Sequence, residues 1–245
     1  MVDLAWHSRV DHGRPEAHRL LPHSEPSLAI RRRFDRNGLT TGYRFDITCV
    51  RPDGGHYCPE PGEEIYGLRL APEWMESALG LRAAELHEND REVPAHLLHL
   101  FGDVRKLADA DDFVSAWKCM LEVTARQGAD AEIDRLGYAA ALSRSAEGRI
   151  TPGELADRAD ISPRHLRRGF VERFGLSPRG WARRLRLTAA LLEAERYDRP
   201  DWAGIAAGNR FSDQAHLIRE CRAILGESPR EFHAQRRGMA VSFNP

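Results

Sequence analysis

Three arginines in one short segment could recognise a nucleic-acid base. The segment ISPRHLRRGF, residues 161–170, contains Arg164, Arg167 and Arg168. A guanidinium group presents a planar fork of N–H donors, which can bond O6 and N7 of guanine together or two oxygens of one phosphate. Each of these arginines is therefore a candidate for base contact, with phosphate contact or simple solvation as the alternative.

A second segment, FSDQAHLIRE at residues 211–220, offers a complementary set of groups. It contains Asp213, Gln214 and Arg219. A glutamine amide matches N6 and N7 of adenine, and a carboxylate can accept a hydrogen bond from N4 of cytosine. Because most protein–DNA hydrogen bonds go to phosphate and sugar, phosphate contact is again the alternative.

Two short helices joined by a tight turn are predicted to position the first set. Thr151 is a suitable N-cap, followed by a proline and, three residues on, by the Glu154 of a capping box. Ser162 followed by proline begins the next helix, and Gly175 can end it in the left-handed conformation. The apolar residues that recur every four positions on this helix are Leu166, Phe170 and Phe174. With that stripe buried, the three arginines point outward.

The same pattern is written a second time. Ile205, Ala206 and Asn209 stand where Leu155, Ala156 and Ala159 stand in the first copy, and Phe211 replaces Ile161. After a one-residue insertion, Leu217, Cys221 and Leu225 repeat the buried stripe, followed by Gly226 and Ser228-Pro229. Two helices joined by a short turn form a helix-turn-helix, so the chain is predicted to contain two such units, at about 151–175 and 201–226.

A continuous helix is predicted to join the two units. No glycine or proline occurs between Trp181 and Asp198, and Trp181, Leu185, Thr188 and Leu192 share one helical face. We expect one helix over about 178–197. A rigid spacer of this kind would let two recognition helices enter successive major grooves on one face of a duplex, about 34 Å apart.

These segments resemble the AraC/XylS family of bacterial transcription regulators. The resemblance covers about 100 residues, and its most specific part is FSDQAHLIRECRAILGESPREF. It implies double-stranded DNA as a partner, with base contacts at Arg164, Arg168 and Gln214 among others, and RNA polymerase as a partner if the protein is an activator. Two departures stand out: Asp160 and Arg210 occupy turn positions where the family usually has glycine, and Cys221 replaces a usual phenylalanine. The operator sequence therefore does not carry over.

The charge of the chain is divided between its halves. Residues 138–245 carry 19 arginines against 13 acidic residues, a net charge of +6, whereas residues 1–137 carry a net charge of −7. This split suggests that only the C-terminal half meets a polyanion. The four cysteines are scattered, no apolar run approaches a membrane span, and MVDLAWHSRV lacks the features of an export signal, so we expect a cytoplasmic protein without a membrane partner.

The N-terminal half is predicted to be a small β-barrel with helices. SLAIRRRFD, YRFDITCVRP and EEIYGLRLAP are strand-like, DRNGL and PDGG are turns, and the residues before them form a loop-like leader. PEWMESALG predicts a short helix, and residues 104–127 a long one. EEIYGLRLAPEWMESALGLRAAEL is similar to the cupin-like domains that precede this DNA-binding module in some regulators, which implies a sensing or dimerising role and a possible small-molecule effector.

One group of residues could support an alternative function. His56, Cys58 and Glu63 have the spacing H-x-C-x4-E, close to the metal-binding pattern of cupins. A cupin-type metal enzyme with a DNA-binding module is therefore one alternative, and a protein-binding scaffold is another. An ordinary barrel edge with a surface pair of glutamates accounts for the same residues. No nucleotide, hydrolase or metalloprotease motif occurs, so we predict no catalytic residue, cofactor or metal ligand.

The resulting prediction is an α+β chain that is not an enzyme. Residues 1–137 form a cupin-like regulatory domain and residues 138–245 an all-α double helix-turn-helix domain, which regulates transcription by reading two successive major grooves. The long helix within 104–127 is a candidate dimer helix because Phe113, Trp117, Met120 and Leu121 exceed what a small barrel needs; packing on the barrel is the alternative. Because its core stripes are self-contained and its charge is positive, the C-terminal fragment from Tyr138 is predicted to fold alone and to bind DNA.

Overall fold

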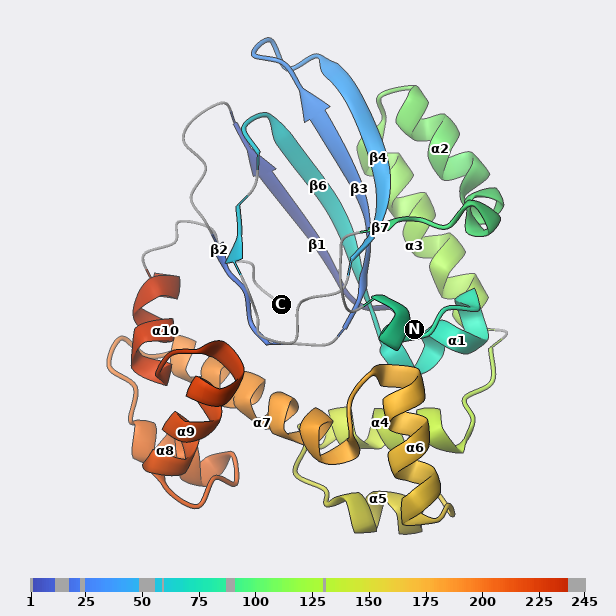
Figure 1. Ribbon diagram of the computed structural model, residues 1–245. Coiled ribbons are helices and arrows are strands. Elements are labelled where there is room, and N and C mark those ends of the chain that lie inside the picture. The colour runs from blue at the N-terminus through green and yellow to red at the C-terminus, as the bar shows by residue number, and fades with distance from the viewer. Residues whose placement is uncertain are drawn as a thin grey trace.

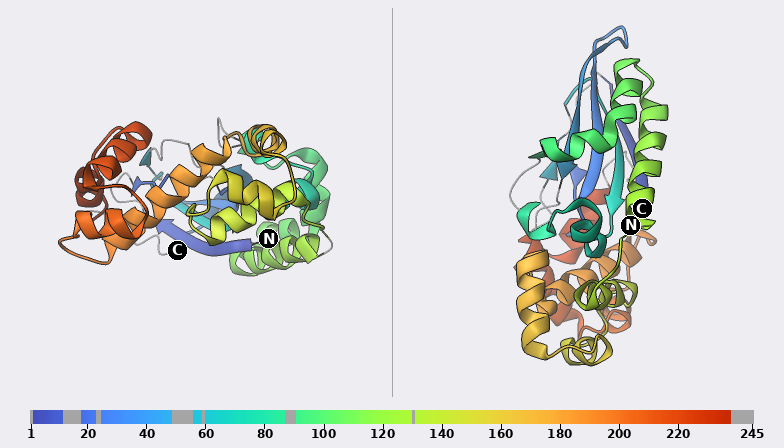
Figure 2. Two further views of the ribbon diagram at one scale, coloured as in Figure 1. Left: turned by 90° about the horizontal axis from the view of Figure 1, so that it is seen from below. Right: turned by 90° about the vertical axis from the view of Figure 1, so that its right-hand side faces the viewer.

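A computed structural model describes residues 2–11, 18–22, 25–48, 56–58, 60–86, 91–129 and 131–237. An antiparallel sheet and its helices form the N-terminal half, and a layer of helices below the sheet forms the C-terminal half (Figure 1). The right-hand view of Figure 2 shows two helices running along one face of the sheet. None of the helices in the described ranges could span a membrane.

The main sheet has the strand order β1-β6-β3-β4-β7, and every neighbouring pair is antiparallel. Its strands are β1 (Val2–Val10), β3 (Ser27–Phe34), β4 (Thr40–Thr48), β6 (Glu63–Leu70) and β7 (Arg91–Glu92). A separate pair consists of β2 (His18–Arg19) and β5 (His56–Tyr57). The mixed α+β class is confirmed, whereas closure of a barrel stays a prediction.

The prediction of a loop-like leader was wrong for its first part. Residues 2–10 form the edge strand β1, which pairs with β6 over nearly its whole length, from Val2 opposite Leu70 to Val10 opposite Glu63. The strand buries an edge of β6, and Trp6 lies directly over Gly67, where a Cβ would stand 2.2 Å from the indole. The predicted turn PDGG lies outside the described residues.

The long helix predicted within residues 104–127 is instead a helical hairpin. Helix α2 (Gly102–Asp109) ends in a turn where Asp111 has φ 61°, and α3 (Phe113–Ala129) runs back beside it. Phe113 and Met120 are buried in the cluster that also contains the sheet residues, and Trp117 Nε1 donates to the Gly67 carbonyl. Much of the apolar set that suggested a dimer helix therefore packs on the sheet.

The remaining helices have clear starts and ends. Short elements before α2 are α1 (Pro72–Leu79) and the 3-10 helices η1 (Ala83–Leu86) and η2 (Ala95–Phe101). The C-terminal half contains α4 (Arg135–Ser145), α5 (Pro152–Arg158), α6 (Pro163–Phe174), α7 (Pro178–Glu195), α8 (Trp202–Gly208), α9 (Gln214–Leu225) and α10 (Pro229–Arg237). The predicted capping box of Thr151 and Glu154 is confirmed, and Gly175 and Gly226 end α6 and α9 at positive φ.

The buried core joins the two halves of the chain. One cluster runs from Leu28 in the sheet through Met75 in α1 to Phe170 and Trp181 around the first helix-turn-helix unit. A second cluster fills the other unit, where Leu191 of α7 packs with Ile205, Leu217 and Cys221. The expectation that the C-terminal core is self-contained therefore fails for the first unit, which shares its core with the N-terminal half.

Candidate nucleic-acid interface

Helix α6 presents its three arginines to solvent at its N-terminal end. Its N-cap is Ser162, whose hydroxyl accepts from the backbone N–H of His165 at 3.2 Å. Burial of Leu166, Phe170 and Phe174 fixes the rotation of the helix, so Arg164, Arg167 and Arg168 are all exposed. Arg168 also lies 3.8 Å from the exposed Glu172, one helical turn on. Such an exposed pair contributes little energy, so Arg168 can exchange it for a nucleic-acid acceptor.

Helix α9 presents a different set. Asp213 is its N-cap, and the carboxylate accepts from the His216 backbone N–H at 2.6 Å. That bond, with a weaker one from Ser212, holds the pKa of Asp213 below its ordinary value. The side chain thus has a structural role that accounts for it, and its contact with cytosine stays a prediction. Gln214, the first helical residue, and Arg219 are exposed.

Both turns contain a residue in the left-handed conformation that is not glycine. Asp160 has φ 51° and Arg210 has φ 57°. For an L-residue this conformation costs roughly 1–2 kcal/mol. Arg135 donates to the Asp160 carbonyl at 2.6 Å, and Arg210 donates to the Arg149 carbonyl at 2.7 Å. Hydrogen bonds at both turns thus offset part of the conformational strain.

A basic groove lies beside Gln214. It has a volume of about 1170 Å³ and is formed by the segment between α7 and α8 together with α8, α9 and α10. Its lining arginines, which sequence reasoning did not single out, are Arg199, Arg222, Arg230 and Arg237. Arg237 pairs with Asp198 at 2.7 Å. Four guanidinium groups in one open groove beside a candidate base-reading residue suit the binding of phosphate oxygens.

The two units lie at opposite ends of α7, as Figure 1 shows. The C-terminal end of α6 is held by the N-terminal half: Arg173 pairs with Glu76 at 2.9 Å and donates to the Glu73 carbonyl at 3.3 Å. Arg173 also pairs with Asp134, the N-cap of α4, at 2.6 Å. These contacts leave the arginine-bearing N-terminal end of α6 free.

The C-terminal end of α9 is held in the same way by Arg19 of β2. This arginine is only 4% exposed and donates to the Leu225 carbonyl at 3.0 Å and to Glu227 at 2.7 Å. Its guanidinium lies 5.4 Å from the centre of the Phe232 ring. The N-terminal half therefore contacts both units away from the ends that carry the candidate reading residues.

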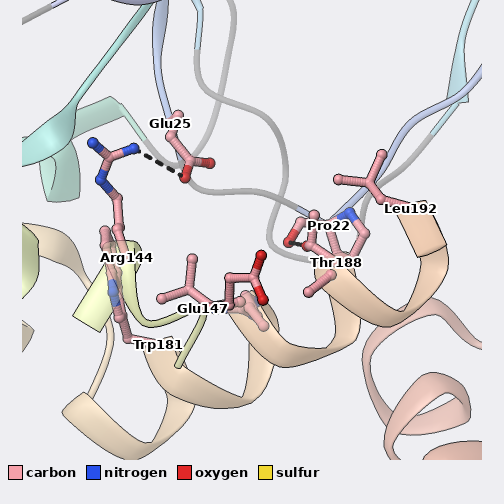
Figure 3. Close-up of a pocket in the computed structure, with 10 residues that line it drawn as sticks. Pro22, Glu25, Arg144, Glu147, Trp181, Thr188 and Leu192 are labelled. Carbon is pink, nitrogen blue, oxygen red and sulfur yellow. Dashed lines mark hydrogen bonds and ion pairs between the residues drawn. The ribbon is translucent and has the colours of Figure 1, made fainter. Parts of the chain in front are cut away.

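A small pocket separates the N-terminal half from α7 (Figure 3). Thr188 donates to the Pro22 carbonyl at 3.1 Å, and Arg144 lies 4.0 Å from Glu25 (Figure 3). The helical face predicted from Trp181, Leu185, Thr188 and Leu192 lines this pocket, so that face meets the N-terminal half. The volume is about 130 Å³, below the roughly 300–1,000 Å³ of ordinary ligand sites. We assign it no ligand.

The possible metal triplet is only partly described. Glu63 is buried and accepts from Arg31 at 2.8 Å, and Arg31 also donates to Asp46 at 2.8 Å. Cys58 is exposed, and the side chain of His56 lies outside the described residues. Among the described residues, no group of three or more potential ligands is placed to hold a metal ion. The ion pair with Arg31 gives Glu63 a structural role.

One comparison with known proteins agrees with the helix-turn-helix units of the C-terminal half. The sequence profile of a helix-turn-helix domain family matches residues 155–235. A transcriptional regulator from Chromobacterium violaceum with an AraC-type DNA-binding domain is 26% identical over 42% of this chain and 91% of its own, with a TM-score of 0.39. ToxT from Vibrio cholerae O395 is 11% identical over 96% of this chain and 98% of its own, with a TM-score of 0.48.

A further ToxT structure, from strain SCE256 with an unsaturated fatty acid bound, is 11% identical over 98% of this chain and 97% of its own, with a TM-score of 0.45. No curated protein sequence matches the chain. The comparisons give no support to the enzyme alternative. With two capped helix-turn-helix units and exposed arginines on the first recognition helix, the C-terminal region is a helix-turn-helix domain of the family whose profile matches residues 155–235.

Proposed function

We propose that the two units read successive major grooves on one face of a DNA duplex. The observation that carries this proposal is the placement of α6 and α9 at opposite ends of α7, each with its C-terminal end held and its N-terminal end exposed. Helix α7 has 18 residues, and at 1.5 Å per residue it spans about 27 Å. A spacer of that length suits reading heads about 34 Å apart, one helical turn of DNA.

The proposal gives each set of residues a role. Arg164, Arg167 and Arg168 contact the first half of the site, with guanine as the base that best fits an arginine fork. Gln214 and Arg219 contact the second half, where Gln214 fits adenine. Asp213 would accept from cytosine through Oδ2, which the cap of α9 does not use and to which Ser212 donates at 3.3 Å. These assignments rest on exposure and helix geometry.

The basic groove beside Gln214 would hold the phosphate backbone that flanks the second half-site. Arg199, Arg222 and Arg230 are exposed there. Contacts of this kind set the register of a protein on DNA without reading its sequence. They should therefore contribute affinity that falls with salt and is equal for all sequences.

Selection of bound duplexes from a random pool tests the proposal directly. The expected result is a site with two conserved blocks about one helical turn apart. A single block, or no enrichment over random duplex, would contradict the two-groove mode. Binding to random duplex that does not weaken as salt rises would instead favour the protein-binding scaffold.

A fragment for the same experiment should begin at residue 131 and not at 138. Helix α4 begins at Arg135 with Asp134 as its cap, so the predicted boundary at 137/138 falls inside the helix. Leu136 also packs on Gly169 of α6, where a Cβ would lie 2.4 Å from it. Loss of its cap and of Leu136 would weaken the first unit for reasons unrelated to DNA binding.

The N-terminal half is proposed to regulate these units through its contacts with them. A small-molecule effector, a homodimer and contact with RNA polymerase remain predictions of the AraC-type assignment. An effector could act by changing the contacts of Arg19 or Arg173, because these connect the sheet and its helices to the recognition helices. Since its target is chromosomal DNA, the proposal places the protein in the cytoplasm.

A further inference from the structure

We propose that a set of arginine contacts between the two units, which we call the arginine bracket, fixes the spacing of the two half-sites. The bracket consists of Arg183, Arg186 and Arg210 with their partners. This inference rests on the proposed two-groove function. It assigns these three arginines a positioning role, distinct from contact with bases.

Arg210 connects the units directly. It lies in the turn between α8 and α9 of the second unit, and its Nη1 donates to the Arg149 carbonyl at 2.7 Å. Arg149 stands two residues before Thr151, the N-cap of α5 in the first unit. Hydrogen bonds from Thr151 lower the pKa of Glu154, the other member of that capping box, and the charges of Arg158 and Arg210 add to this effect. A glycine in this turn would avoid the strain at φ 57° but could not reach across.

Arg186 and Arg183 extend the bracket from α7. Arg186 donates to the Gly148 carbonyl at 3.0 Å, and its guanidinium lies 6.0 Å from the centre of the Phe211 ring, just before α9. Arg186 is half-buried between these groups, and this burial lowers the pKa of its guanidinium. Arg183 pairs with Glu220 of α9. The first half of α7, which packs with the first unit, is thereby tied to the second recognition helix.

The loop that accepts these bonds has little freedom to move. Gly148 has φ +71°, and a Cβ at this position would lie 2.3 Å from the Ala182 carbonyl oxygen of α7. The backbone of the loop therefore lies directly on the helix. Its carbonyl groups are fixed acceptors, so a hydrogen bond from Arg186 or Arg210 transmits the position of one unit to the other.

The alternative source of rigidity is packing of each unit on α7. The first unit packs on the half that contains Trp181, and the second on the half that contains Leu187 and Leu191. If this packing alone set the spacing, loss of the bracket would leave the preferred spacing as strict as before. The two explanations therefore predict different effects of bracket substitutions on the preferred spacing of the half-sites.

The test measures affinity of the full chain for the selected site and for versions with one base pair inserted or removed between the half-sites. One base pair changes their separation by about 3.4 Å and their relative rotation by about 34°. The wild-type protein should lose about tenfold in affinity, the scale of one defect in a specific site. In Arg210→Ala and Arg186→Met, that loss should shrink to threefold or less, with base preferences in each half-site unchanged.

Three controls make the result decisive. Arg210→Lys, which keeps a donor and the charge, should recover most of the strict spacing. Arg196→Ala removes an exposed arginine at the end of α7 and should leave the spacing preference intact. Circular dichroism and thermal unfolding show whether each variant folds. Because Arg210 is exposed, Arg210→Ala should fold, and it alone suffices for the test if Arg186→Met does not fold.

An unchanged spacing penalty in folded Arg210→Ala would overturn the bracket and favour packing on α7. A wild-type protein indifferent to spacing would overturn it as well. Failure of the two-groove function would be seen in the selection experiment, which would yield a site without two conserved blocks. The outcomes for the bracket and for the function are thus separable.

Discussion

Replacement of Arg173 by alanine should destabilise the full chain more than it destabilises a C-terminal fragment that begins at residue 131. The side chain of Arg173 is 7% exposed, whereas its partners Glu76 and Asp134 are 46% and 59% exposed. Breaking a fully buried pair costs about 3–5 kcal/mol. Because both carboxylates regain water after the substitution, we expect the lower range for a charged hydrogen bond, about 2 kcal/mol in the full chain.

The fragment contains only part of this network. It keeps Asp134 but lacks Glu76 and the Glu73 carbonyl. The same substitution should therefore cost it about 1 kcal/mol, half of the loss in the full chain. Denaturant unfolding of both proteins, followed by circular dichroism, gives the two free energies. Arg158→Ala, an exposed residue of α5, is the matched control and should change both by less than about 0.5 kcal/mol.

Equal losses in the full chain and the fragment would refute the reasoning. That result would mean that Arg173 contributes through Asp134 and local packing, and that Glu76 and the Glu73 carbonyl add nothing. The contact between α1 and α6 would then be irrelevant to the stability of the first unit. A greater loss in the full chain supports a stabilising link between the sheet half and the recognition helix.

Three further predictions concern DNA binding and pH. Arg164→Ala and Arg168→Ala should each relax base specificity in one half-site, and Gln214→Ala should do so in the other half-site. Each substitution should cost about 1–3 kcal/mol of binding free energy. Footprinting that maps all three effects to the same bases would contradict the two-groove mode. Arg230→Ala should weaken binding equally for all sequences and reduce the slope of log K against log salt by about 0.9, whereas a loss confined to the selected site would assign it to base reading. The cap bond lowers the pKa of Asp213 below 3.8, so its stabilisation is present above that pH and is lost as the pH falls through the folded-state pKa. Asp213→Asn, which can still cap α9, should remove this part of the acid sensitivity in thermal unfolding as the pH falls below the ordinary aspartate pKa. An unchanged pH profile would count against this assignment.

Local signals accounted for the helix-turn-helix units. The cap at Thr151, the proline after Ser162 and the glycines at 175 and 226 act within one turn of the backbone, so the residues that encode them are adjacent in sequence. The buried stripe through Phe170 then follows from the helical period and decides which side chains face outward. For that reason the candidate reading residues could be named before the fold was known.

Other features lacked so direct a signal. The alternation Val2, Leu4, Trp6 in β1 was present, but a strand is defined by its partner, and β6 lies about 60 residues away. The turn between α2 and α3 contains no glycine or proline that would mark it in the sequence. Asp111 takes the left-handed conformation there instead. Helical periodicity continues across such a turn, which explains why one long helix was expected.

What the sequence by itself determined was therefore the local plan: two capped units, a linker helix and the outward arginines. Only the tertiary structure decided how those units are held. Arg19 bonds the end of α9 across more than 200 residues, and Arg210 bonds the Arg149 carbonyl across 61. The sequence gives the charge and the length of an arginine side chain but not its hydrogen-bond partner, because a guanidinium can donate to phosphate, carboxylate or carbonyl oxygens. Its partner is fixed by which backbone the folded core brings within hydrogen-bonding distance.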